Sequence, residues 1–224
     1  MSDRFAWWDS EGFAAIRLII LVLLLVPFLD YITSSSTSQG NVTAIVGIPC
    51  NIQLGQGWNY ISICAQPANT SIASVLQGID YRYVMLWNAS SQKFDIFSPK
   101  AANPPFNSFD TNKSYFILYS NATPATLDVI GNLSGDENIS LVQGWNPPAW
   151  PYIFTSNISC YLQSITNKYN YVMKWNYTPQ QFIIYSPRAA EPQFTTISRG
   201  EGQFISVIDP SGALLRYNKT FCEP

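Results

Sequence analysis

The chain contains no histidine, and only 12% of its 224 residues are charged. A globular domain usually carries about 25% charged residues. The absence of imidazole excludes Ser-His-Asp triads, histidine acid–base catalysis and histidine metal sites. The net charge of -2 provides no basic surface, so we expect no nucleic-acid partner. Aromatic residues reach 15%, which is typical of a folding sequence and not of a disordered one.

The remaining ionisable side chains show no spacing typical of a catalytic or metal site. The carboxylates lack the pairing seen in glycosidases and the periodicity of calcium loops. Serine residues have no histidine base, and the presence of lysines elsewhere does not make a hydrolase the favoured interpretation. We therefore predict a protein that is not an enzyme, with no catalytic residue, no metal ligand and no cofactor. The carboxylates considered are Asp80, Asp95, Asp110, Asp128, Asp136, Glu137, Glu191, Glu201 and Asp209.

Three segments return in the same order at an offset of 87 or 88 residues. They are IQLGQGWN (52–59) and ISLVQGWN (139–146), YVMLWN (83–88) and YVMKWN (171–176), and FDIFSPKAANPPF (94–106) and FIIYSPRAAEPQF (182–194). Such a long period indicates that each copy is a small folded unit. The repeated chemistry is aromatic, proline and turn chemistry, which is typical of a scaffold.

A hydrophobic segment near the N-terminus predicts a membrane anchor. Residues 13–32 contain an uninterrupted apolar run from 18 to 29 and reach the roughly 20 residues needed to cross a bilayer. Arg4 and Arg17 flank its start, whereas residues 31–81 contain no Lys or Arg. The positive-inside rule therefore places the N-terminus in the cytoplasm. We predict a cytoplasmic segment (1–12), a transmembrane helix in contact with lipid (13–32) and an extracellular remainder.

Two other interpretations of this segment remain open. A cleaved signal peptide fits the hydrophobic core, but the leader carries Asp3, Asp9 and Glu11, and no small-x-small cleavage site follows. A pilin-type leader would be cut after Gly12. Pilin leaders usually have a basic residue before that glycine, and bacterial ones have a glutamate five residues into the mature helix. Glu11 and Arg17 stand at these positions here, so an uncleaved anchor is the favoured interpretation.

Asn-X-Ser/Thr sequons occur ten times, all beyond the predicted anchor. Together they indicate N-glycosylation of exposed loops, although a merely polar surface is the alternative. Asn88 and Asn176 are repeat equivalents, which predicts the same exposed turn in both copies. The sequon asparagines are Asn41, Asn69, Asn88, Asn112, Asn121, Asn132, Asn138, Asn157, Asn176 and Asn218.

The four cysteines also lie beyond the predicted anchor, and an even number in an extracellular protein predicts two disulfides. Three connectivities are possible. We favour Cys50–Cys64 with Cys160–Cys222, which gives one bridge per repeat. A metal site would need close cysteine pairs or a histidine, and the sequence has neither.

The hydrophobic pattern predicts a mainly β fold with a minor α component. Residues 33–51 read as a polar stalk and first strands (44–46 and 52–54), followed by two tandem antiparallel β-rich repeats (52–132 and 138–220) joined around 131–137. Each repeat has one short helix with apolar residues at i, i+3, i+4 and i+7, namely Ile72, Val75, Leu76 and Ile79, then Ile158, Tyr161, Leu162 and Ile165. The other strands expected are 58–64, 81–87, 94–97, 115–119, 127–130, 169–175, 182–185, 203–208 and 213–217.

These motifs resemble the "GWN" repeat of archaeal cell-surface and S-layer-associated proteins. The resemblance covers residues 52–130 and 139–217 and implies extracellular, β-rich adhesion or envelope modules from an archaeon, without catalytic residues. It weakens late in each copy, where KSYF (113–116) and EGQF (201–204) replace the usual Gly-Tyr-Trp. The matching positions are Gln56, Gly57, Trp58, Asn59, Trp87, Ser98, Pro99, Gln143, Gly144, Trp145, Asn146, Trp175, Ser186 and Pro187.

The tryptophans have two interpretations: they form a platform on which sugars stack, or they pack in the core. Trp58, Trp87, Trp145 and Trp175 occupy matched strand positions, which favours core packing. Trp150 lies in the unrepeated segment NPPAWP (146–151), and we predict it as a candidate exposed contact.

Two classes of function follow from these features. The favoured one is a membrane-anchored extracellular glycoprotein that acts as a structural or assembly component of an archaeal envelope, surface filament or virion membrane. We expect it to associate with itself or with other envelope proteins, and a surface adhesin or receptor-binding role is a variant of it. The alternative is an accessory single-span subunit of a membrane enzyme complex.

Overall fold

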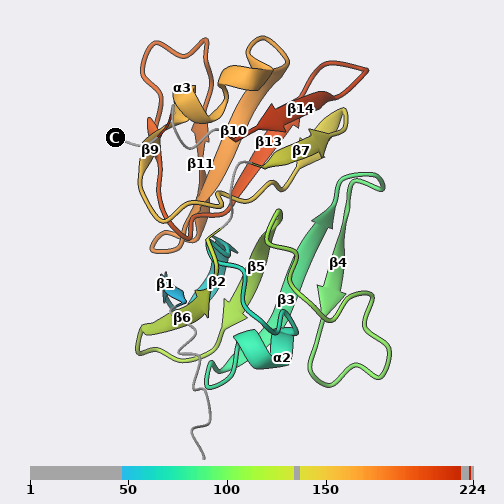
Figure 1. Ribbon diagram of the computed structural model, residues 1–224, viewed down its shortest axis with the longest axis vertical. Coiled ribbons are helices and arrows are strands. Elements are labelled where there is room, and N and C mark those ends of the chain that lie inside the picture. The colour runs from blue at the N-terminus through green and yellow to red at the C-terminus, as the bar shows by residue number, and fades with distance from the viewer. Residues whose placement is uncertain (1–46, 134–136, 218–221, 223–224) are drawn as a thin grey trace, which may run out of the picture. The chain divides into compact units, whose positions relative to one another are not determined.

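The computed structural model describes residues 47–133, 137–217 and 222 (Figure 1). The predicted cytoplasmic segment, the anchor at 13–32, the stalk with the strand at 44–46, and the sequons at Asn41 and Asn218 lie outside these residues. Within the described ranges, no helix is long and apolar enough to cross a bilayer.

The first repeat is a four-stranded antiparallel sheet with a two-stranded sheet beside it. The strand order of the larger sheet is β2 (Gly57–Ser62), β5 (Ser114–Tyr119), β3 (Tyr81–Asn88) and β4 (Lys93–Phe97). The smaller sheet pairs β1 (Ile48–Leu54) with β6 (Ala125–Gly131). A short helix, α2 (Ile72–Val75), separates β2 from β3, and the Ser71 side chain caps its N-terminus.

The second repeat has the same strand order. Its four-stranded sheet runs β8 (Gly144–Asn146), β13 (Gln203–Val207), β10 (Tyr169–Asn176) and β11 (Gln181–Tyr185). Its small sheet pairs β7 (Asn138–Leu141) with β14 (Ala213–Arg216). The helical part consists of α3 (Ile158–Tyr161) and η1 (Gln163–Ile165). A further short pair, β9 (Ser156–Asn157) with β12 (Thr196–Ile197), was not expected from the sequence.

The prediction of a mainly β, antiparallel fold with one short helix in each repeat is confirmed. The two repeats even share an irregularity, because the register shifts between Tyr81 and Tyr83 in β3 and between Tyr169 and Tyr171 in β10. Several strand ends differ from the prediction, and β1 begins at Ile48 although a strand was expected only over 52–54. The strand expected over 58–64 stops at Ser62, and from there its main chain bonds to the second repeat.

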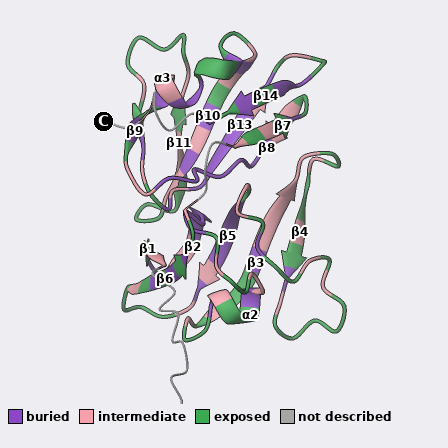
Figure 2. Ribbon diagram, viewed as in Figure 1, coloured by how far each residue is buried: buried purple, intermediate pink, exposed green. Residues whose placement is uncertain are grey.

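Each repeat encloses its own hydrophobic core, and a third cluster joins them. The first core gathers residues of β1, β2, α2, β3, β5 and β6, and the second gathers residues of β7, α3, η1, β10, β13 and β14. Figure 2 shows buried residues on β2, β5 and β13. The third cluster contains Tyr60, Phe116 and Phe204. The described residues of both repeats belong to one compact unit.

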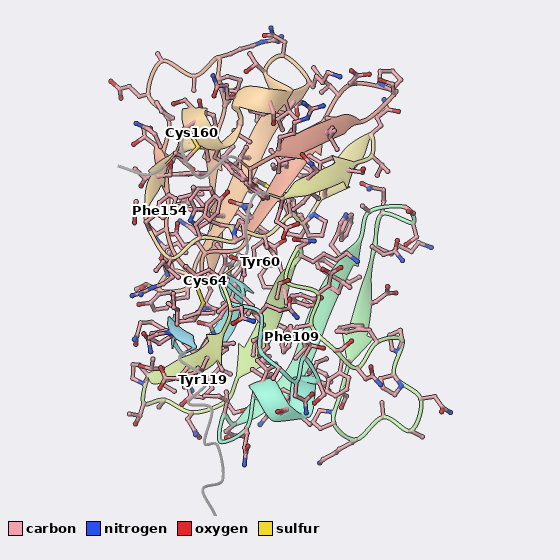
Figure 3. All side chains as sticks on the ribbon, in the orientation of Figure 1. Tyr60, Cys64, Phe109, Tyr119, Phe154 and Cys160 are labelled. Carbon is pink, nitrogen blue, oxygen red and sulfur yellow. A yellow bond between two sulfur atoms is a disulfide. The ribbon has the colours of Figure 1, made fainter. Side chains whose placement is uncertain are left out.

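Both disulfides of the favoured connectivity are present. Cys50–Cys64 fixes β1 to the end of β2, and Cys160–Cys222 fixes α3 to the C-terminal segment, with Cα atoms 5.6 and 5.7 Å apart. Figure 3 shows Cys64 and Cys160 in different repeats, so each repeat contains one bridge.

Candidate functional site: the junction of the two repeats

The repeated Gly-Trp-Asn motif builds the junction between the repeats. The asparagine closes the turn before its strand, because its amide bonds both the N–H and the C=O of the residue four positions earlier. This holds for Asn59 with Gly55 and for Asn146 with Val142. The turn leaves the main-chain N–H and C=O of the tryptophan accessible, and side chains of the other repeat form hydrogen bonds with them.

The two tryptophan motifs exchange hydrogen bonds across the junction. The Trp87 Nε1–H donates to the Trp145 carbonyl at 2.9 Å, and the Trp175 Nε1–H donates to the Trp58 carbonyl at 2.7 Å. Each repeat therefore supplies one donor and one acceptor in matching positions. The contact resembles a two-fold dimer interface within a single chain.

Two glutamines add further hydrogen bonds to the main chains of Trp145 and Trp58. Gln92 accepts from the Trp145 N–H at 2.9 Å and donates to its carbonyl at 3.0 Å. Gln180 does the same with Trp58, at 2.8 and 3.1 Å. A Cβ atom at Gly57 would approach the Gln180 side chain to 2.7 Å, and φ there is +93°, so only glycine suits the position.

Main-chain hydrogen bonds also run directly between the repeats. The Gly202 N–H donates to the Tyr60 carbonyl at 3.0 Å, and the Ser114 N–H donates to the Pro147 carbonyl at 2.7 Å. These bonds occupy equivalent positions in the two copies. They accompany two isolated antiparallel bridges, Ile61 with Glu201 and Lys113 with Pro148, that tie the main chains of the two repeats together.

An aromatic cluster fills the space between the two sheets. Phe116 lies 5.4 Å from Trp175, and its repeat equivalent Phe204 lies 5.9 Å from Trp87, both edge to face. Tyr60 stacks between the two phenylalanines, with centroid distances of 4.3 and 4.7 Å (Figure 3). The core-packing interpretation of the four repeated tryptophans is therefore supported, since all four pack against this cluster.

Two grooves flank the junction, and equivalent residues line them. Groove A, of about 640 Å³, is lined by Asn51, Asn59, Lys174, Trp175, Tyr177 and Glu201, among others. Groove B, of about 510 Å³, is lined by Asn88, Asp95, Phe106, Asp110, Asn138 and Asn146, among others. Most lining positions correspond through the repeat, although Ile153 and Thr155 line groove A alone and Pro105 and Phe106 line groove B alone.

Groove A contains a buried ion pair. The Lys174 ammonium lies 2.8 Å from Glu201 Oε1 and also donates to the Thr196 carbonyl at 3.2 Å. Lys174 is only 9% exposed, and its ammonium lies 4.9 Å from the centroid of the Phe194 ring. Glu201 in turn accepts from the Ser198 N–H, so both charges are hydrogen-bonded. The pair is thereby satisfied within the protein and has a structural role.

Groove B contains exposed charges in place of that pair. Lys113 forms a solvent-exposed ion pair with Asp110 at 3.1 Å, and Asp95 accepts from the Asn88 side chain at 3.3 Å. The residue equivalent to Lys174 is Leu86, which packs against the first core. In the part of the chain that the structure describes, no group of three or more Cys, Asp or Glu residues is arranged to hold a metal ion.

The prediction for Trp150 is wrong. Its side chain is 0% exposed, its Nε1–H donates to the Phe154 carbonyl, and four aromatic rings surround it edge to face. The segment NPPAWP looked like an exposed loop because it is rich in proline and unrepeated. It instead folds back under α3 and supplies the centre of the second core.

The described sequons differ in accessibility. Five are exposed, namely Asn69, Asn121, Asn132, Asn138 and Asn157. The equivalent pair Asn88 and Asn176 does occupy the same turn, but both side chains are half-buried and their oxygens accept main-chain N–H groups of that turn. Asn112 is also half-buried, beside groove B.

Buried tyrosines lie in and beneath the junction. Burial raises the pKa of Tyr60, Tyr161 and Tyr217 well above the ordinary value, because a phenolate there would lose its hydration. The hydroxyl groups of Tyr161 and Tyr217 lie 3.1 Å apart, and that of Tyr60 donates to the Gln203 carbonyl. These groups are neutral hydrogen-bonding members of the core.

Sequence reasoning missed the two glutamines. A signal existed, because Gln92 and Gln180 are identical at the repeat offset in otherwise divergent turns. No protein-family model matches this chain, and comparisons with curated proteins and with solved structures give no match either.

Proposed function

We propose that this chain is a membrane-anchored, N-glycosylated structural protein that assembles at the surface of an archaeal cell, surface filament or virion. Residues 13–32 anchor it in lipid, the N-terminus lies in the cytoplasm, and the two repeats lie outside. The observation that carries the proposal is one disulfide in each repeat. Disulfides persist in oxidising compartments and are rare in the cytosol of most organisms.

The junction supports a scaffold role. Reciprocal hydrogen bonds from Trp87, Gln92, Trp175 and Gln180 join the repeats, so the ectodomain is one body and not two independent binding modules. The exposed sequons support glycosylation, because a sugar transferase needs the asparagine accessible.

Isolation of the protein from its native membrane tests this proposal. Chemical deglycosylation should shift its electrophoretic mobility strongly, and electron microscopy of the undisrupted material should show a polymer or an ordered array. Bare asparagines together with a fixed stoichiometric complex with a multi-span enzyme would contradict the proposal and favour the accessory-subunit alternative.

Glycan recognition by groove A is a second candidate function. Trp175 and Tyr177 provide aromatic rings beside the exposed polar side chains of Gln53 and Arg199, a combination suited to stacking and hydrogen-bonding a sugar. Tyr177→Ala should then abolish binding on a glycan array. Tyr171→Ala is the matched control, because Tyr171 is similarly exposed but does not line the groove.

A further inference from the structure

The outer edges of the two four-stranded sheets differ. β4 and β11 are the terminal strands of their sheets (Figure 1). At β11, Ile184 points its main-chain groups away from β10. The Ile184 N–H donates to Gln193 Oε1 at 2.6 Å, and the Ile184 carbonyl accepts from the Gln193 N–H at 3.4 Å. One glutamine therefore occupies both outward main-chain groups of Ile184.

In the described part of the chain, no side chain bonds to the edge of β4 as Gln193 bonds to Ile184. Ile96 is paired with Met85 as Ile184 is paired with Met173, so the N–H and C=O of Ile96 also point outward. The residue equivalent to Gln193 is Pro105, which has neither a main-chain N–H nor a side-chain amide. Phe94, two residues before Ile96, turns its main chain to the same side. The side chains of Phe94 and Ile96 are 38% and 50% exposed.

The charges on β4 are complementary to those of a second β4. Lys93 and Asp95 lie on one face of the strand, and Phe94 and Ile96 lie on the other. If two β4 strands pair antiparallel about Phe94, Lys93 of each copy lies opposite Asp95 of the other. Opposite charges in such cross-strand positions stabilise a sheet, whereas like charges destabilise it.

We propose that β4 is a self-association edge, at which a second copy of this chain adds its own β4 and continues the sheet. The register is centred on Phe94, with main-chain hydrogen bonds from Phe94 and two reciprocal Lys93–Asp95 ion pairs. This inference rests on the proposed assembly function and identifies one contact of that assembly. Because both copies use the same β4 edge about a two-fold axis, this mode of pairing closes after two copies and does not extend into a fibre.

Cross-linking of the full-length protein in detergent tests the register. Equal amounts of unlabelled and nitrogen-15-labelled chains are mixed and treated with a zero-length carbodiimide, which joins a lysine amine to a carboxylate in contact with it. Mass spectrometry should find a Lys93–Asp95 cross-link in which one peptide is labelled and the other is not. Such a mixed pair can form only between two copies.

Charge-reversal variants test how much the ion pairs contribute to dimerisation. Their dimerisation is measured by sedimentation in density-matched detergent. Lys93→Asp and Asp95→Lys should each weaken dimerisation at least tenfold, and the double variant should restore it to within about threefold of the original, because the pairs are re-formed in the reverse sense. Gln181→Asp, at the position of β11 equivalent to Lys93, is the matched control and should change nothing.

A monomeric protein, or a dimer that neither variant weakens, would overturn the β4 proposal. An array that persists in native membranes of the Lys93→Asp variant would do so too, while leaving the proposed structural function intact. Bare asparagines and a cytosolic ectodomain would instead contradict the proposed function, whatever the state of β4.

Discussion

The first repeat closes its disulfide over a separation of 14 residues, whereas the second closes its disulfide over 62. The first repeat places Leu86 and Lys113 where the second places the buried pair of Lys174 and Glu201. Yet both copies keep the same strand order and make the same glutamine and tryptophan bonds. The hydrogen bonds of the junction come from residues that the sequence repeats, whereas Trp150, which lies in an unrepeated segment, is buried in the second core alone.

Removal of the Trp150 side chain should cause the largest loss of stability among the changes considered. Trp150→Ala should lower the free energy of unfolding by about 3 to 5 kcal/mol, because it leaves a large cavity in the second core and removes a buried hydrogen bond. Trp58→Ala, at the partly exposed rim of the junction, should cost less. Guanidinium unfolding of the full chain, followed by circular dichroism, gives both values. Equal losses would show that the second core is not the more demanding site.

The two disulfides should contribute unequally. In the chain-entropy account, loss of the Cys160–Cys222 bridge costs about 4 kcal/mol, and loss of the Cys50–Cys64 bridge costs about 3 kcal/mol, since the longer loop restricts the unfolded chain more. Paired cysteine-to-alanine variants, measured by the same unfolding experiment, check the order. The reverse order would mean that local packing outweighs chain entropy.

The buried ion pair should be more sensitive than its exposed counterpart. Glu201→Ala leaves the Lys174 ammonium buried without its charge partner and should cost about 2 kcal/mol, less than for a fully buried pair because the Glu201 side chain is 35% exposed. Lys113→Ala in the first repeat should cost under about 0.5 kcal/mol.

Replacing Lys174 and Glu201 with the residues found at the equivalent positions of the first repeat sharpens this test. Lys174→Leu combined with Glu201→Lys reproduces Leu86 and Lys113, and it should recover stability to within about 1 kcal/mol of the original, because no buried charge remains. A loss as large as that of Glu201→Ala would mean that the ion pair has a role beyond satisfying its own charges.

Alkaline pH should destabilise the protein through its buried tyrosines. Burial raises the folded-state pKa of Tyr217 above the ordinary value near 10, so the unfolded chain loses this proton first. The contribution is therefore fully present below about pH 10 and falls by about 1.4 kcal/mol per pH unit above it, for each such tyrosine. Tyr217→Phe should reduce the slope of stability against pH between 10 and 12 by about that amount. An unchanged slope would show that the Tyr217 hydroxyl titrates normally.

A further expected effect concerns the contact between Gly55, in the turn after β1, and Tyr177, in the turn after β10. A Cβ atom at Gly55 would lie 2.5 Å from the Tyr177 ring, whereas the equivalent positions carry Val142 and Ala89, with the large and small residues exchanged. Gly55→Val should cost about 1 to 2 kcal/mol, and adding Tyr177→Ala should recover about 1 kcal/mol of it. Purely additive losses would show that the two residues do not interact.

The fold could be predicted largely because the same sequence pattern occurs in both repeats. The apolar spacing of Ile72, Val75 and Leu76 is weak evidence for so short a helix, but the same spacing at Ile158, Tyr161 and Leu162 made it reliable. The disulfide pairing followed from the same logic, with one bridge assigned to each copy. What is local in sequence and present in both repeats was therefore accessible.

The contacts at the junction could not be predicted from the sequence in this way. Gln92 is an ordinary turn residue by its neighbours, and its partner lies 53 positions away in another repeat. Lys174 and Glu201 meet only because β10 pairs with β13 in a register that places Lys174 opposite Gln203. Trp150 failed as a prediction because proline-rich segments usually lie at the surface, and only the tertiary fold buries this one.

Surface labelling of intact cells tests the central claim most directly. Lys93, Lys100 and Lys113 are exposed on the first repeat and should react with a membrane-impermeant amine reagent before the cells are opened. Peptide mapping without reduction should find both disulfides in the same molecules. If these lysines react only after lysis, the repeats lie inside the cell and the proposed surface role is contradicted.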